Sequence, residues 1–171
     1  MSRQFVTEAV MIAIYGQLLV SSSPVEYIVP YTTVIELYEL RDSDDPLMNR
    51  PEDDKHVKRK IAELIDYFEE PLNAKKINRC LAIPWAKSSG ILLGDQTMIT
   101  IINSIDTAVY GETFDPIETE LLLSSQREKA PILTDQFELI QRIIEGGIPV
   151  QVYDIDDFDF AMEEESFRNS H

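Results

Sequence analysis

The feature that most constrains the fold is a strand–helix–strand pattern in residues 131–155. Residues 131–134 (PILT) form one continuous apolar run, and residues 148–152 (IPVQV) form a second. Between them, the segment QFELIQRII has the apolar spacing of a helix, which Gly146 and Gly147 end. Strands joined by a crossover helix are parallel, and strands without polar alternation are buried on both faces. We therefore predict a three-layer α/β fold, a parallel sheet flanked by helices.

The helix before this pattern carries the clearest start signal in the chain. Asp115 is a favoured N-cap residue, Pro116 suits the first helical position, and Glu118 completes a capping box. We expect this helix to run to about Lys129. Upstream we predict a helix over 5–20, a strand over 25–31, a helix over 33–40 capped by Thr32 or Thr33, a loop over 41–54, and helices over 56–70 and 73–83. A strand–turn–strand follows over 91–102, with a helix over 97–105 as the alternative for its second half.

The length and composition suit one globular domain. The chain has 171 residues, of which 44% are hydrophobic. We place the domain at residues 1–155 and an acidic C-terminal tail at residues 156–171. The single cysteine, Cys80, excludes an internal disulfide and is predicted to be a buried thiol. Since the apolar runs are too short to span a bilayer, we expect a cytoplasmic protein without membrane contact.

The charge of the chain limits its partners. Its 31 acidic residues against 15 Lys and Arg give a net charge of −16, which disfavours broad binding to nucleic acid. Eight of the bases lie within residues 55–87, as solvated helix faces or as a local RNA-binding patch. The two histidines, His56 and His171, do not support a catalytic triad, and there is no glycine-rich phosphate loop.

Three acids are candidates for a metal site because they follow predicted strands. Parallel sheets bind ligands at the carboxyl ends of their strands, where Glu36, Glu118 and Asp135 are expected. Carboxylates gathered there would hold Mg²⁺ or Mn²⁺, which can activate water for phosphodiester cleavage. Each acid also has a structural explanation. Glu36 can be a solvated helix residue, Glu118 a member of the capping box, and Asp135 the cap of the next helix.

Two stretches resemble the PIN domain family. ETELLLSSQREKAPILTDQFELIQRIIEGGIPVQVY is similar to the C-terminal half of a PIN domain, and PYTTVIELYEL is similar to the segment that leads into a helix with a glutamate. The resemblance implies an α/β fold and, in many members, a ribonuclease dependent on Mg²⁺ or Mn²⁺. The positions that match its acidic residues are Glu36, Glu118 and Asp135, as catalytic and metal-binding residues.

The chain departs from this family pattern near its N-terminus. The family places an aspartate after the first strand, where this chain offers Gln17, and its only acids upstream of Glu36 are Glu8 and Glu26. We therefore expect a degenerate PIN-like domain that acts without catalysis and without a cofactor, by binding another protein or itself. The predicted contact surfaces are the first helix, at Met11 and Tyr15, and the segment around Trp85.

Two alternatives stay open. The first is an Mg²⁺- or Mn²⁺-dependent ribonuclease that uses the three matching acids, with RNA held by Lys58, Arg59 and Lys60. The second is an α/β domain that binds a small molecule and has no relation to PIN domains.

Overall fold

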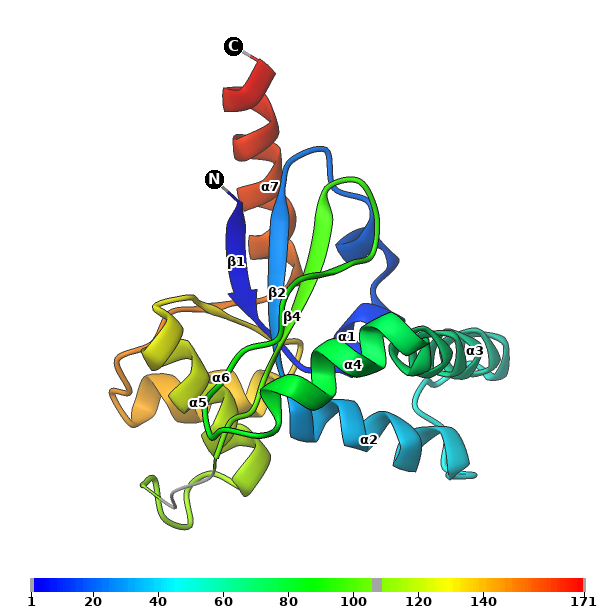
Figure 1. Ribbon diagram of the computed structural model, residues 1–171. Helices are drawn as coiled ribbons and strands as arrows, with labels where there is room; N and C mark the ends of the chain where they lie inside the picture. The colour runs from blue at the N-terminus through cyan, green and yellow to red at the C-terminus, as the bar shows by residue number, and fades with distance from the viewer. Residues whose placement is uncertain (1, 106–108, 171) are drawn as a thin grey trace.

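The computed structural model describes residues 2–105 and 109–170 (Figure 1). Within them lies one six-stranded sheet in the order β3-β4-β2-β1-β5-β6. All neighbouring pairs are parallel except β3 with β4. The strands are β1 (Arg3–Val6), β2 (Val25–Pro30), β3 (Ile91–Leu92), β4 (Thr97–Ile102), β5 (Ile132–Leu133) and β6 (Val152–Tyr153).

Helices pack on both faces of the sheet. They are α1 (Ala9–Ile14), the 3₁₀ helix η1 (Gly16–Leu19), α2 (Tyr31–Asp42), α3 (Pro51–Glu69), α4 (Pro71–Cys80), α5 (Pro116–Glu128), α6 (Phe137–Glu145) and α7 (Ile155–Ser170). Alternate strand residues belong to two apolar clusters, one on each face of the sheet. Phe5 and Tyr27 belong to the cluster with residues of helices α1 to α4 and α7, whereas Val6 and Ile28 belong to the cluster with residues of α5 and α6. The predicted α/β architecture is confirmed.

The strand order places a topological switch at the centre of the sheet. The chain passes from β1 to β2 and β4 on one side, and then returns to β5 and β6 on the other. β1 therefore lies between β2 and β5. In open α/β sheets, the crevice outside the carboxyl ends of strands at such a switch is the usual ligand site. The residues that follow β1 and β5 are consequently the first place to look for function.

The predicted helix over residues 5–20 is wrong. This segment contains the strand β1, the short helix α1 and the 3₁₀ turn η1. The β1 residues lie in register with β2, from Arg3 opposite Val25 to Val6 opposite Ile28. Tertiary pairing in the middle of the sheet therefore outweighs the helical spacing of the apolar residues.

The predicted tail is also different in the structure. Helix α7 covers Ile155–Ser170, and Phe158 and Ala161 are buried in the core. Phe158 packs edge-on against Phe5, with ring centroids 5.2 Å apart. The core therefore extends past residue 155.

Most other predicted elements are confirmed, with shifted boundaries. The strand–turn–strand over 91–102 is the antiparallel pair β3 and β4, and Cys80 is buried. Helix α3 begins at Pro51, inside the predicted loop. The N-cap position of helix α2 is Pro30, not Thr32 or Thr33, and no side chain caps this helix.

Candidate functional site

Five carboxylates collect near the carboxyl ends of the parallel strands, and we call this group the acidic edge. Its members are Glu8 after β1, Glu36 on α2, Asp115 and Glu120 at and within α5, and Asp135 after β5. The local backbone is well fixed, because the Thr7 hydroxyl donates to the Leu133 carbonyl at 2.8 Å and thereby links the ends of β1 and β5.

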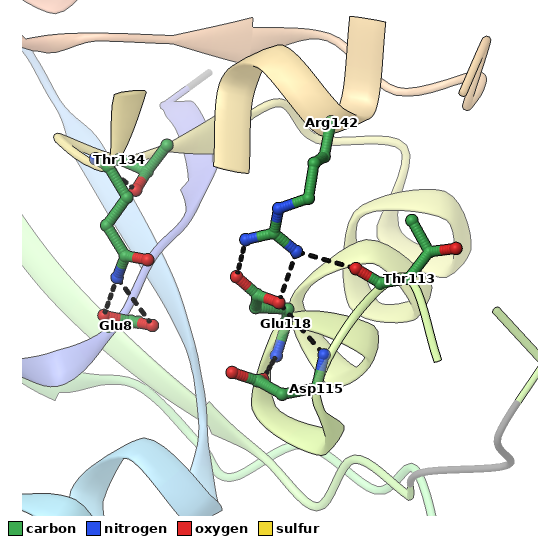
Figure 2. Close-up of polar contacts among 7 residues, drawn as sticks. Glu8, Thr113, Asp115, Glu118, Thr134 and Arg142 are labelled. Atoms are coloured by element: carbon green, nitrogen blue, oxygen red, sulfur yellow. Dashed lines mark hydrogen bonds and ion pairs between the residues drawn. The ribbon is translucent and has the colours of Figure 1, made fainter. Parts of the chain in front are cut away.

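Glu8 occupies the centre of the acidic edge at the switch between β1 and β5. Its half-buried carboxylate accepts hydrogen bonds from the Gln136 side-chain amide at 3.2 and 3.4 Å (Figure 2). Burial, and then the negative charges of Glu36, Asp135 and Asp115, raise the pKa of Glu8 to about 7. A carboxyl group with such a pKa in a ligand-binding position is a candidate functional group.

Glu36 and Glu120 form the part of the acidic edge beside β2. Burial raises the pKa of Glu36, and the charges of Glu39, Asp115 and Glu120 raise it further. Glu120 is only 3% exposed, and it accepts hydrogen bonds from the hydroxyls of Thr32 at 2.9 Å and Ser104 at 2.8 Å. Donors from α2 and from the segment after β4 thus hold Glu120 in place.

Asp135 lies on the other side of Glu8 and is exposed. Its carboxylate accepts a hydrogen bond from the Tyr15 hydroxyl at 2.7 Å, and the pKa of Tyr15 is raised to about 12 by burial and then by Asp135. The proposed alternative that Asp135 caps α6 is wrong. The N-cap residue is Gln136, which makes no side-chain cap, and the backbone N–H of Gln136 donates to the Thr134 hydroxyl.

Glu118 is engaged differently from the other acids. It is 7% exposed, and its carboxylate accepts two hydrogen bonds from the Arg142 guanidinium of α6, one of 2.8 Å (Figure 2). Arg142 also donates to the Thr113 carbonyl. The Arg142 guanidinium holds the pKa of Glu118 below its usual range. The predicted capping box is confirmed, since Asp115 and Glu118 exchange both hydrogen bonds.

Two of the three predicted site residues, Glu36 and Asp135, lie near enough to Glu8 for their charges to raise its pKa. The third, Glu118, is held in an ion pair with Arg142. Glu8 was not among the predicted site residues. The available signal was its place directly after a short apolar run that ends in Val6-Thr7.

The acidic edge has the donor chemistry of a metal site but not its geometry. The donor chemistry suits a hard cation, because all members are carboxylates. The positions do not: among the residues that the structure describes, no group of three or more His, Cys, Asp or Glu side chains is placed to hold a metal ion. The carboxylates are instead spread along the edge, where Glu8, Asp115, Glu120 and Asp135 accept hydrogen bonds from different donors.

Two of the three bases predicted to hold RNA, Lys58 and Lys60, make polar contacts within the chain. Lys58 donates to the Ser43 carbonyl and lies 3.7 Å from Asp54, and Lys60 pairs with Glu63 at 3.2 Å.

Over residues 2–105 and 109–170, no helix is long and apolar enough to cross a membrane. Comparison with protein-family models, with curated proteins and with solved structures found no match to this chain.

Proposed function

We propose that the chain is a degenerate PIN-like α/β domain that acts without catalysis, by binding another protein through its acidic edge. The observation that supports this proposal best is the place of Glu8, directly after β1 at the switch between β1 and β5, with the charges of Glu36, Asp135 and Asp115 acting on it. Three negative neighbours and partial burial disfavour its ionised form, and a cation brought by a ligand would relieve this repulsion. The position at the switch between β1 and β5 agrees with a binding role.

Lys and Arg side chains of a partner are the cations that suit this edge best. A guanidinium needs only one or two carboxylates, and it pairs with them through parallel hydrogen bonds. Arg142 makes this arrangement with Glu118 within the chain itself. Carboxylates spread along an edge, rather than converging on one point, suit several basic side chains better than a single ion.

A defined basic peptide tests this proposal. We expect a fluorescent hexa-arginine peptide to bind the wild type in an anisotropy titration, with affinity that falls as salt rises. The double variant Glu8→Gln/Asp135→Asn should weaken binding about tenfold or more. The matched variant Asp66→Asn/Glu145→Gln, which removes two exposed charges elsewhere, should weaken it far less. Equal losses in the two variants would show general charge attraction and contradict the proposal.

An Mg²⁺- or Mn²⁺-dependent ribonuclease is the second candidate, and one observation favours it. Glu8 follows β1, so an acid is present where the family resemblance demands one, although it is a glutamate. If this candidate holds, Mn²⁺ should raise the melting temperature of the wild type relative to EDTA, because a metal binds the folded state only. It should also support cleavage of an unstructured RNA, and Glu8→Gln should remove both effects. Absence of both effects would leave the non-catalytic proposal.

A further inference from the structure

Helix α7 has one face in the core and one face exposed. The inner face carries Phe158 and Ala161, both buried, and Phe158 contacts Phe5 and Tyr27 with ring centroids 5.2 and 6.3 Å away. The rest of the helix continues past the amino end of β1, away from the acidic edge (Figure 1). Its exposed side is therefore a second surface, which begins after the carboxyl end of β6 and runs toward the amino ends of the strands.

Two aromatic side chains stand on this exposed side. Phe160 is 64% exposed and Phe167 is 66% exposed, which is unusual for a residue type that is mostly buried. They are seven positions apart, so they lie on one stripe of the helix, about 10 Å from each other. This is the spacing at which successive apolar side chains of a partner helix would meet them.

Shallow hollows adjoin both phenylalanines. A hollow of about 390 Å³ is lined by Phe160 together with Val152, Tyr153 and Glu164. A second, of about 340 Å³, is lined by Phe167, Glu163, Glu164 and Arg168, whose guanidinium lies 4.0 Å from Glu165. Arg3 borders the first hollow, but its guanidinium is engaged by Glu165 at 3.1 Å and by the Tyr153 hydroxyl at 2.9 Å. The hollows offer room for apolar side chains from outside.

Acids frame the aromatic stripe. Exposed carboxylates precede Phe160 and fill the turn between the two phenylalanines, at Asp156, Asp157, Glu163 and Glu164. With Phe160 and Phe167, they define what we call the α7 outer face. Such a face repels nucleic acid, anionic membranes and a second copy of this chain, whose net charge is −16.

We propose that the α7 outer face binds a basic amphipathic helix of another protein. Apolar residues of that helix would pack on Phe160 and Phe167, and flanking Lys or Arg side chains would pair with Glu163 and Glu164, as in two-helix pairing. This surface uses none of the residues of the acidic edge. It gives the chain a second contact that does not depend on Glu8.

A synthetic helix provides the test. The probe is a fluorescent Leu/Lys peptide of about three heptads in amphipathic order, compared with a Leu/Glu peptide of the same pattern and a Lys/Ser peptide of the same charge. We expect the Leu/Lys peptide alone to bind. Phe160→Ser/Phe167→Ser should weaken its binding about tenfold or more, whereas the matched variant Phe137→Ser/Ile144→Ser, which changes residues 68% and 71% exposed on α6, should not.

Charge reversal supplies an independent arm. Glu163→Lys/Glu164→Lys should weaken the Leu/Lys peptide and admit the Leu/Glu peptide, while Glu8→Gln should change neither, which separates this surface from the acidic edge. Unaltered melting temperatures would show that the exposed substitutions leave the fold intact. Equal binding of the Lys/Ser peptide, or unchanged affinity in Phe160→Ser/Phe167→Ser, would overturn the proposal.

Discussion

Replacement of Glu8 by glutamine is the most direct test of the electrostatics of the acidic edge. The folded-state pKa of about 7 lies above the ordinary value of 4.5. Because the folded-state pKa is the higher one, ionisation of Glu8 lowers the free energy of unfolding. The stability due to protonated Glu8 is fully present below pH 4.5, and it is lost as the pH rises through 7. At about 1.36 kcal/mol per pKa unit, this difference amounts to at most about 3 kcal/mol, and partial exposure reduces it to about 2 kcal/mol.

Glutamine keeps the shape of glutamate and can still accept a hydrogen bond from Gln136, but it carries no charge. We therefore expect Glu8→Gln to be more stable than the wild type by about 2 kcal/mol at pH 8, or about 5 °C in melting temperature, and nearly equal to it at pH 4.5. Urea unfolding at half-unit pH steps measures this difference directly.

Glu145→Gln is the control for that series, since Glu145 is exposed at the end of α6. It should change the free energy of unfolding by less than about 0.5 kcal/mol at every pH. If Glu8→Gln were less stable than the wild type at pH 8, or if its advantage persisted undiminished at pH 4.5, the repulsion argued for the acidic edge would be refuted.

Three further substitutions test other parts of the structure. Arg142→Met should lower the free energy of unfolding by about 1 to 3 kcal/mol near pH 7. Because the pKa of Glu118 is lowered in the folded wild type, this loss should shrink as the pH falls below 4.5. A pH series of urea unfolding would show the change. Phe158→Ala should cost about 3 kcal/mol or more if α7 is part of the core, and a loss under about 1 kcal/mol in thermal or urea unfolding would contradict its burial. Tyr15→Phe removes the hydrogen bond to Asp135 at 2.7 Å and should cost about 1 kcal/mol, with a double-mutant cycle to Asp135→Asn to show that the two losses are coupled.

The part of the fold from α5 to β6 could be predicted because its signals are local. A capping box at Asp115 and Glu118 starts α5, apolar spacing defines α6, and Gly147 adopts a positive φ of 60° just after that helix. Parallel pairing of β5 with β6 then follows from the crossover helix between them. None of these inferences depends on contacts with a distant part of the chain.

The N-terminal part could not be predicted in the same way. β1 has four residues and is followed by α1 after only two more, so Val6, Val10 and Ile14 fall at helical spacing across two different elements. What makes residues 3–6 a strand is pairing with β2 and β5 on either side, which is tertiary information. Because β1 is not predicted from the sequence, Glu8 is not predicted as a site residue either: its position matters only because it follows a central strand.

The composition of residues 156–171 favours an acidic tail over a helix, because acids dominate it. The helical signal was nevertheless present, since Ile155, Phe158, Ala161 and Met162 share one face, with Phe158 and Ala161 buried. The acids of this segment correctly indicate that it contacts solvent. They do not indicate that a stripe of buried residues runs along the same helix.

The contrast between Glu118 and Glu8 connects the electrostatics of the acidic edge with the proposed binding role. Both carboxylates are at least partly buried near the same edge of the sheet, but their pKa values move in opposite directions. The difference is the neighbour: a guanidinium faces Glu118, whereas Glu8 faces the neutral amide of Gln136 and three other acids. A Lys or Arg side chain brought to Glu8 by a partner would do there what Arg142 does at Glu118. Binding would then lower the pKa of Glu8, so a proton would be released below pH 7 and affinity would rise with pH up to that value.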